Sequence, residues 1–174
     1  MAPPRPHLVI GTQNPVGQLG TYPLAESQLD RFGLSTSIGY PDAEVETRLV
    51  LHNGGRFALD SMTAVADTAQ WERVIGATSR VHVVHEVAAY AVALVRGTRT
   101  TGSVRLGASP RAAISLLRSA QAHAVLSGRP YVTPGDVQAV AVSCLSHRLL
   151  TDGAGEDGPA LVARVLADTP APRT

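Results

Sequence analysis

The sequence contains no lysine, because all 15 of its Lys+Arg residues are arginines. A Walker A loop needs a lysine that reaches the β- and γ-phosphates of a nucleotide, so these 174 residues hold no complete P-loop. Enzymes that form a Schiff base also use a lysine amine, and that chemistry is excluded for the same reason. Two lysine-dependent kinds of site are therefore absent from the chain.

The chain also has a single cysteine, a net charge close to zero and no long apolar run. The single cysteine, Cys144, excludes an internal disulfide and suits a reducing compartment. The 14 acidic residues balance the arginines to a net charge of +1, which gives no basic footprint for nucleic acid. No segment approaches the roughly 18 consecutive apolar residues of a membrane span, and the N-terminus lacks the pattern of a signal peptide. With 44% hydrophobic residues, we expect a folded, cytoplasmic protein that binds neither nucleic acid nor membrane.

Two short strands and a short helix are predicted in the first 40 residues. The apolar run 8–10 ends in a polar turn at 11–15, as a buried strand does. A short helix follows within LAESQLDRF (24–32), and the weak alternation over 33–38 predicts a second strand. A parallel α/β domain needs more strands than these, so we expect an incomplete sheet.

From Asp42 onward the pattern is helical. Asp42 is a good N-cap for the first of these helices, and Ser109 precedes Pro110 as an N-cap precedes a first helical proline. Thr133 repeats that start signal, with Asp136 placed to close a capping box. We predict helices over 42–53, 63–72, 84–99, 110–127 and 134–150, with Val65 and Trp71 in the core. The expected fold class is mainly α, a helical bundle preceded by a partial α/β unit.

Asn14 lies in the polar turn after the first predicted strand, in the sequence VIGTQNP. Ligands in open α/β sheets lie beyond the carboxyl ends of strands. An asparagine offers both a donor and an acceptor, with which it can orient a water molecule against a phosphate. The Asn-Pro pair is also an ordinary start of a turn, and spacing alone favours that simpler interpretation.

Two arginines are placed where they can meet an anion. Arg31 ends the short helix in LDRF, where a guanidinium bonds either the last carbonyls of its own helix or a neighbour's phosphate as an arginine finger. Arg111 follows Ser109 and Pro110, against the positive end of the helix dipole, at a cost of about 0.3–1 kcal/mol. An anion docked at the helix N-terminus turns that cost into a gain, whereas many exposed first-turn arginines have no function.

Two stretches closely resemble the C-terminal part of MoxR-type AAA+ ATPases: VIGTQNPVGQLGTYPLAESQLDRF and VRLGASPRAAISLLRSAQAHAVLSGRPYVTPGDVQAVAVSCLSHRL. The resemblance runs from about Leu8 to Leu150, includes ALVRGTR at 93–99 and keeps the family's order. A TQNP strand end, an LDRF helix end and a GASPRA helix start form a highly specific combination. In this family the Walker A loop and the Walker B acidic residues lie upstream of the TQN strand.

The resemblance implies a role for each candidate residue. Asn14 would be the sensor 1 residue, which positions the attacking water against the γ-phosphate. Arg31 would be the arginine finger, offered to the nucleotide of the next subunit in a ring. Arg111 would be sensor 2, carried by the lid and touching the γ-phosphate as the lid closes. All three would place donors where charge develops in the transition state.

The resemblance also implies domains, cofactors and partners. Residues 1–41 would be the C-terminal remnant of a P-loop NTPase core, 42–150 the helical AAA lid domain, and 151–174 a linker and tail. ATP and Mg²⁺ are the implied cofactors. Family members form homo-oligomeric hexameric rings with chaperone-like remodelling roles, often alongside proteins with von Willebrand factor A domains.

We therefore expect the C-terminal portion of a MoxR-family AAA+ ATPase, with sensor 1, arginine finger and sensor 2 but without Walker A and Walker B, and with no ATPase activity alone. The alternative is a stand-alone helical interaction module or an arginine-finger donor to a partner ATPase. We also expect the helical part to fold on its own. The first 40 residues should be labile, because a strand without neighbours leaves its backbone groups unpaired.

Two closely spaced pairs carry residue types that bind zinc, His82 with His85 and Cys144 with His147. The first pair lies at a junction between a loop and a helix, and the second near a helix end. No role in the family supports a metal at either place, so we expect no metal site. Cys144 is predicted to be a small buried hydrophobe.

Overall fold

A computed structural model describes residues 6–13, 24–51, 61–101, 104–151 and 156–173. The helices are α1 (Glu26–Leu29), α2 (Ala43–Leu51), α4 (Thr68–Ser79), α5 (His85–Thr100), α6 (Pro110–Leu126), α7 (Pro134–Leu145), the 3-10 helix η2 (Ser146–Arg148) and α8 (Gly158–Asp168). Two short strands, β1 (Val104–Leu106) and β2 (Leu150–Thr151), pair with each other. The chain is therefore mostly helical with little sheet, and this confirms the predicted fold class.

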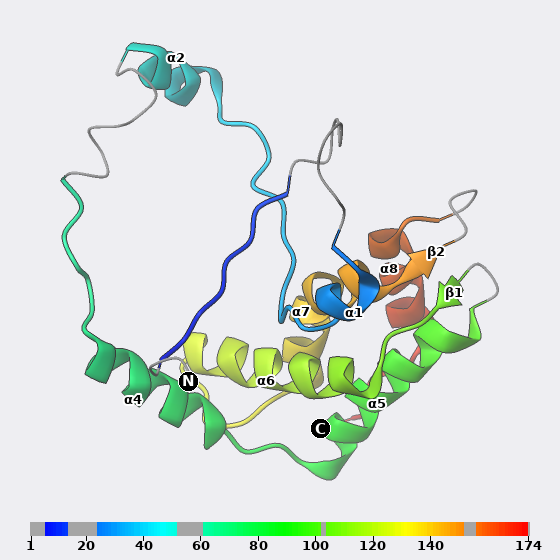
Figure 1. The fold of residues 1–174 in the computed structure, drawn as a ribbon. Helices are drawn as coiled ribbons and strands as arrows, with labels where there is room; N and C mark the ends of the chain where they lie inside the picture. The colour runs from blue at the N-terminus through cyan, green and yellow to red at the C-terminus, as the bar shows by residue number, and fades with distance from the viewer. Residues whose placement is uncertain (1–5, 14–23, 52–60, 102–103, 152–155, 174) are drawn as a thin grey trace.

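The core lies between α5, α6, α7 and α8 (Figure 1). α6 packs along α7 and also contacts α4 and α5, and α8 packs against α5 and α7. The largest fully buried apolar side chains come from all four helices: Leu94, Leu116, Leu145, Leu161, Val87, Val95, Val137 and Val162. α8 belongs to this core although it falls within the stretch expected to be a linker and tail. The domain boundaries at 41 and 150 stay predictions.

A single glycine lets α5 and α8 approach each other closely. A Cβ atom on Gly97 would lie 2.8 Å from Cγ1 of Val165, which is too short for two carbon atoms in contact. A glycine inside a helix costs roughly 1 kcal/mol relative to alanine. The close packing of the two helices is what this position gains in return.

The connection between α6 and α7 is organised around the buried carboxylate of Asp136, whose side chain is 1% exposed. Arg129 Nη1 donates to it at 2.6 Å, the Thr133 backbone N–H at 2.7 Å, and His123 Nδ1 lies 2.6 Å away. The Arg129 guanidinium holds the pKa of this carboxyl well below its usual range. Thr133 and Asp136 form the predicted capping box at the start of α7. Gly128, with a φ of 70°, ends α6 in the left-handed conformation that suits glycine.

The helix starts after Asp42, Ser109 and Thr133 are confirmed, but three predicted boundaries are wrong. The helix expected over 63–72 begins only at Thr68, because Asp67 and Gln70 form a reciprocal capping box that starts it there. The same helix continues to Ser79. α7 ends at Leu145, not near 150, and passes through η2 into β2. Residues 52 and 53, the last two of the helix predicted over 42–53, lie outside the described residues.

Val65 and Trp71 are not core residues as predicted. Val65 is 99% exposed and precedes the start of α4, and Trp71 is 47% exposed on α4. α4 packs along one end of α6 and buries none of its own residues. Its apolar side is covered only in part, so helical spacing alone overstated its burial.

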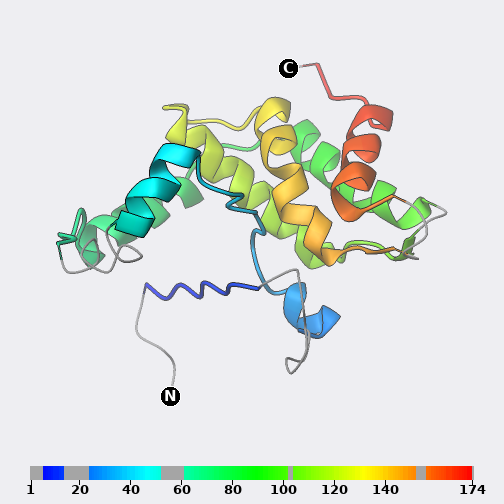
Figure 2. The same ribbon diagram turned by 90° about the horizontal axis from the view of Figure 1, so that it is seen from above.

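The two strands predicted near the N-terminus are not strands in the structure. Residues 6–13 run extended without a strand partner (Figure 2), and Leu8, Val9 and Ile10 are 71%, 61% and 79% exposed. Residues 33–38 are irregular, and only the Ser35 N–H reaches the bundle, at the Ser143 carbonyl oxygen. A strand needs neighbouring backbone to bond with, and the described residues provide none at either segment.

The strand pair that does form was not predicted. Val104 pairs with Thr151 and Leu106 with Leu150 in antiparallel register. β1 has three residues and β2 two, too few for an alternating pattern to identify. No helix among the described ranges is long and apolar enough to cross a membrane.

Replacing Asp136 with asparagine should destabilise the bundle. The change removes the negative charge that pairs with Arg129, and breaking a buried pair costs about 3 kcal/mol. Because the pKa of Asp136 is lowered on folding, its contribution is complete above about pH 4 and is lost as pH falls further. Urea unfolding at pH 7 and at pH 3.5 measures both effects.

The control is Glu72→Gln, which neutralises an exposed carboxylate on α4. It should leave the unfolding free energy within about 0.5 kcal/mol of the wild type. An Asp136→Asn variant as stable as this control at pH 7 would contradict the role given to the buried carboxylate.

Candidate functional site

The turn that carries Arg31 is held against the helical bundle. α1 ends at Leu29, and Arg31 and Phe32 close the turn with backbone bonds from their N–H groups to the carbonyl oxygens of Gln28 and Leu29. The Phe32 carbonyl oxygen then accepts from Nη2 of Arg148. These two residues are 116 positions apart in the chain. α1 and η2 therefore meet at this point of the fold.

Arg148 is buried at the centre of this contact, with its side chain 1% exposed. Its Nη2 also donates to Ser115 Oγ on α6 at 3.1 Å, and its Nη1 lies 3.8 Å from Oδ1 of Asp30. Burial lowers the pKa of the Arg148 guanidinium, the charge of Asp30 opposes that shift, and the charge of Arg111 adds to it. Asp30 thus offsets part of the cost of burying this cation.

His147 also lies beside the Phe32 carbonyl oxygen. Its Nε2 is 3.1 Å from that oxygen and 3.3 Å from Nε of Arg148. The guanidinium can only donate, so one ring nitrogen cannot serve both neighbours at once. Burial lowers the pKa of His147 and favours the neutral ring, which is the form that tolerates a cation alongside.

Ser109 joins the same cluster from the start of α6. Its hydroxyl donates to both carboxylate oxygens of Asp30, at 2.9 Å and 3.0 Å. Ser109 is the N-cap of α6, as predicted, but its side chain makes no capping bond to the helix. The Ala112 N–H bonds instead to the Ser109 carbonyl oxygen at 3.0 Å. The hydroxyl is therefore used to reach across the fold.

Arg31 and Arg111 each lie close to a residue of this cluster in the sequence. Arg31 directly follows Asp30, and Arg111 lies two residues after Ser109 in the first turn of α6. Both side chains are exposed, and within the described part of the chain neither has a hydrogen-bond or ion-pair partner. The structure thus brings the two predicted arginines to one region and leaves both guanidinium groups available.

Asn14 lies outside the described residues, and its predicted role rests on the sequence. The extended segment just before it runs beside the turn, since a Cβ on Gly11 would lie 3.7 Å from the ring of Phe32. Four residues of the site were not identified from the sequence as part of it: Asp30, Ser109, His147 and Arg148. They stand inside the motifs LDRF, GASPRA and SHRL, but only the fold shows that these motifs meet.

The donor set suits a phosphate better than a metal ion. Two unpartnered guanidinium groups and a helix start are groups that bind phosphate oxygens. No cluster of three or more His, Cys, Asp or Glu side chains that could hold a metal occurs among the residues that the structure describes. The chemistry of these groups therefore suits phosphate oxygens such as those of the implied nucleotide.

The two pairs considered for zinc lie in different surroundings. The backbone of His82 bonds to Pro130 and Val132 through its N–H and carbonyl groups, beside the α6–α7 connection. His147 faces Phe32 and Arg148. Cys144 is fully buried, as predicted for a small hydrophobe, and burial raises the pKa of its thiol.

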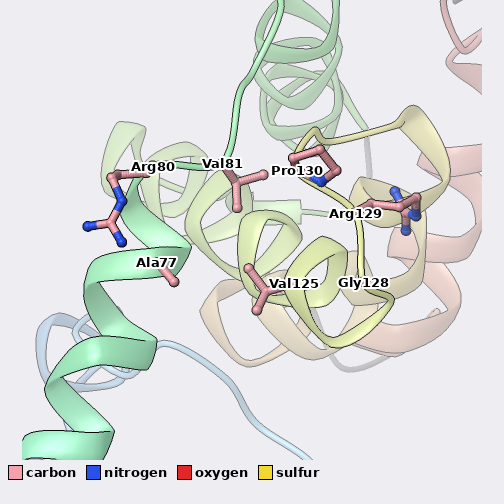
Figure 3. Close-up of a pocket in the computed structure, with 7 residues that line it drawn as sticks. All are labelled: Ala77, Arg80, Val81, Val125, Gly128, Arg129 and Pro130. Carbon is pink, nitrogen blue, oxygen red and sulfur yellow. The ribbon is translucent and has the colours of Figure 1, made fainter.

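A shallow hollow of about 390 Å³ lies at the opposite end of α6. Figure 3 shows Ala77 and Arg80 on one side of it, and Val125 with the loop from Gly128 to Pro130 on the other. α6 has 17 residues, so about 25 Å of helix separates this hollow from the cluster around Arg148. None of the predicted site residues lines it.

Comparison with known proteins agrees with the geometry. The family model "AAA lid domain" matches residues 96–166, and the model "ATPase family associated with various cellular activities (AAA)" matches residues 1–34. Uncharacterized protein YeaC of Bacillus subtilis is 37% identical over 83% of this chain and 45% of its own length. Chaperone MoxR1 of Mycobacterium tuberculosis is 35% identical over 84% of this chain and 41% of its own length.

A crystal structure of a proposed ATPase from Cytophaga hutchinsonii superposes with a TM-score of 0.80 at 28% identity. It matches 92% of this chain and 53% of that protein. The chain thus spans a little under half the length of these two curated relatives and about half of the solved structure. The two family models match the two regions whose motifs meet at the cluster.

Stability should depend on the protonation of His147. Its pKa is lower in the folded chain than the ordinary value of about 6.5, so the unfolded chain binds a proton more readily. The unfolding free energy should therefore fall as pH drops from about 7 to about 5.5. His147→Gln keeps a donor for the Phe32 carbonyl and should make this fall smaller.

Thermal unfolding at several pH values between these limits measures the slope. The exposed His85, at the start of α5, provides the control. His85→Gln should retain the wild-type slope. Equal slopes for the wild type and His147→Gln would show that the neutral ring of His147 is not needed at this site.

Proposed function

Because this chain belongs to the MoxR-type AAA+ ATPases, we propose that its exposed arginines complete nucleotide sites in a ring of such ATPases. The family hydrolyses ATP. In this proposal Arg31 is the arginine finger and Arg111 is the sensor 2 residue. The observation that carries it is the bond from Ser109 to Asp30, which links the two motifs while neither arginine has a partner of its own.

The surroundings of the two arginines support these roles. An arginine that acts on a phosphate must have a fixed backbone and an unengaged guanidinium. The backbone around Arg31 is fixed by the bonds of Asp30 and Phe32, and that of Arg111 by the start of α6. A phosphate would supply the negative charge that Asp30 does not, since Asp30 already faces Ser109 and Arg148.

Arg31 and Arg111 would act on two different nucleotides. Arg111 would contact a γ-phosphate on the side of its own lid, in a subunit completed by a Walker A loop, and Arg31 that of the next subunit in a hexameric ring. Asn14 would position the attacking water as sensor 1. ATP hydrolysis would then drive chaperone-like remodelling, and proteins with von Willebrand factor A domains are the partners we propose for it.

The chain by itself should neither bind Mg²⁺-ATP tightly nor hydrolyse it. A chain without lysine has no Walker A loop to hold the β- and γ-phosphates, and two exposed arginines alone give weak, salt-sensitive binding. Titration with a fluorescent ATP analogue, with and without Mg²⁺, and a steady-state phosphate-release assay measure this. Tight binding that requires Mg²⁺ would contradict the proposal.

The role of Arg31 can be tested by complementation. The partner is a full-length relative with an intact Walker A loop, such as Chaperone MoxR1, whose own arginine finger has been replaced by alanine. Adding the wild-type chain should restore ATP hydrolysis, since an arginine finger supplied in trans accelerates hydrolysis about 10³–10⁵-fold. Arg31→Ala in the added chain should abolish the restored activity.

Arg73→Ala is the matched control, because Arg73 is an exposed arginine on α4 without a partner in the described part of the chain. It should restore hydrolysis as well as the wild type does. Co-sedimentation of chain and partner separates binding from catalysis. A chain that binds the partner but restores nothing would support the alternative, a helical interaction module.

A further inference from the structure

The Ser109 hydroxyl makes a long-range hydrogen bond and no local capping bond. A serine at a helix N-cap usually accepts a bond from the N–H of the second or third helical residue. In this chain the Ser109 hydroxyl instead donates to Asp30, 79 residues earlier in the sequence. The helix forgoes a local bond for a contact with another part of the fold. That contact ends on the residue directly before Arg31.

The residues on both sides of Arg31 are held, whereas Arg31 itself is free. Asp30 accepts from Ser109 and faces Arg148 at 3.8 Å. The Phe32 carbonyl accepts from Arg148. Between them the Arg31 side chain is exposed without a partner in the described part of the chain. Such an arrangement leaves the Arg31 guanidinium available to a group outside the chain.

The two holding contacts come from different elements. Arg148 belongs to η2, and its guanidinium is buried. Ser109 belongs to the first turn of α6, the same turn that carries Arg111. The Ser109 contact therefore connects Arg31 directly to the turn that bears Arg111, whereas Arg148 reaches α6 further along the helix, at Ser115.

We propose that Ser109 is a positioning residue that couples the helix start bearing Arg111 to the turn bearing Arg31. This inference rests on the proposed function. When the start of α6 shifts as Arg111 engages a phosphate, the Ser109–Asp30 bond carries that shift to the arginine finger. The nucleotide in one subunit thereby adjusts the finger that the subunit offers to the next. By linkage, engagement of Arg31 alters nucleotide affinity at Arg111 to the same extent.

Hydrogen exchange in the isolated chain tests the mechanical part. The Arg31 and Phe32 amides should exchange about tenfold faster in Ser109→Ala, because a bond to a charged group no longer holds the turn. Ser109→Thr keeps a hydroxyl and should restore the wild-type rate. Ser27→Ala removes an exposed hydroxyl on α1 and is the control. Amides of α7 should be unchanged in all variants, which shows that the bundle stays folded.

Complementation of the fingerless partner tests the functional part. Ser109→Ala should lower the restored kcat about tenfold or more, with the KM for ATP and binding to the partner unchanged, since a misplaced finger weakens the transition state only. Ser109→Thr should restore kcat. A variant that merely unfolded would lose partner binding instead.

The outcomes separate this inference from the proposed function. If Arg31→Ala has no effect on the restored rate, the arginine-finger assignment fails. If Arg31→Ala abolishes the rate while Ser109→Ala leaves it at the wild-type level, the positioning role of Ser109 fails alone. Unchanged exchange of the Arg31 and Phe32 amides in Ser109→Ala overturns it without any partner.

Discussion

The buried guanidinium of Arg148 is the interaction on which the site depends. A buried cation is costly unless it is hydrogen-bonded and paired. The bundle itself provides only the Ser115 hydroxyl and the His147 ring nearby. The remaining partners, the Phe32 carbonyl and the Asp30 carboxylate, come from the turn after α1. The need to satisfy Arg148 therefore fixes the turn against the bundle, and Arg31 with it.

The electrostatics of the cluster explain why two arginines remain available. Asp30 is shared between the Ser109 hydroxyl and the charge of Arg148. It therefore neutralises little of the charge on Arg31. The positive charge of Arg111 repels that of Arg148 and lowers the pKa of its guanidinium. A local excess of positive charge results in a chain whose net charge is only +1. Phosphate groups are attracted to such a region even when the whole molecule is nearly neutral.

The parts of the fold that local chemistry determines could be predicted from the sequence. The helix starts at Ser109 and Thr133 follow from the proline and capping signals, and Asp136 closes the predicted capping box. The start of α4 was missed because Asp67 and Gln70 cap it five residues after the expected position. The burial of Val65 and Trp71 was wrong because periodicity indicates which face is apolar but not what covers it.

The site could be predicted only in part, for a similar reason. The motifs that contain Arg31 and Arg111 were identified, but their meeting depends on Ser109, His147 and Arg148. These residues act across the fold, and no spacing in the sequence shows that a capping serine gives its hydroxyl to Asp30. The useful signal in the sequence is an arginine, Arg148, that stands next to apolar residues. Arginine is rarely buried without a partner, and SHRL lies between the apolar end of α7 and β2.

The turn that carries Arg31 keeps its place although the N-terminal segment pairs with no strand among the described residues. The apolar pattern at 8–10 is that of a strand, yet these side chains are exposed, because strand pairing depends on backbone far away in sequence or in another polypeptide. The turn after α1 nevertheless keeps its place, since its contacts run to α6 and η2 and not to a sheet. The positions of both arginines thus follow from side chains that this chain itself contains, and a completed sheet would add to them the strand end that precedes Asn14.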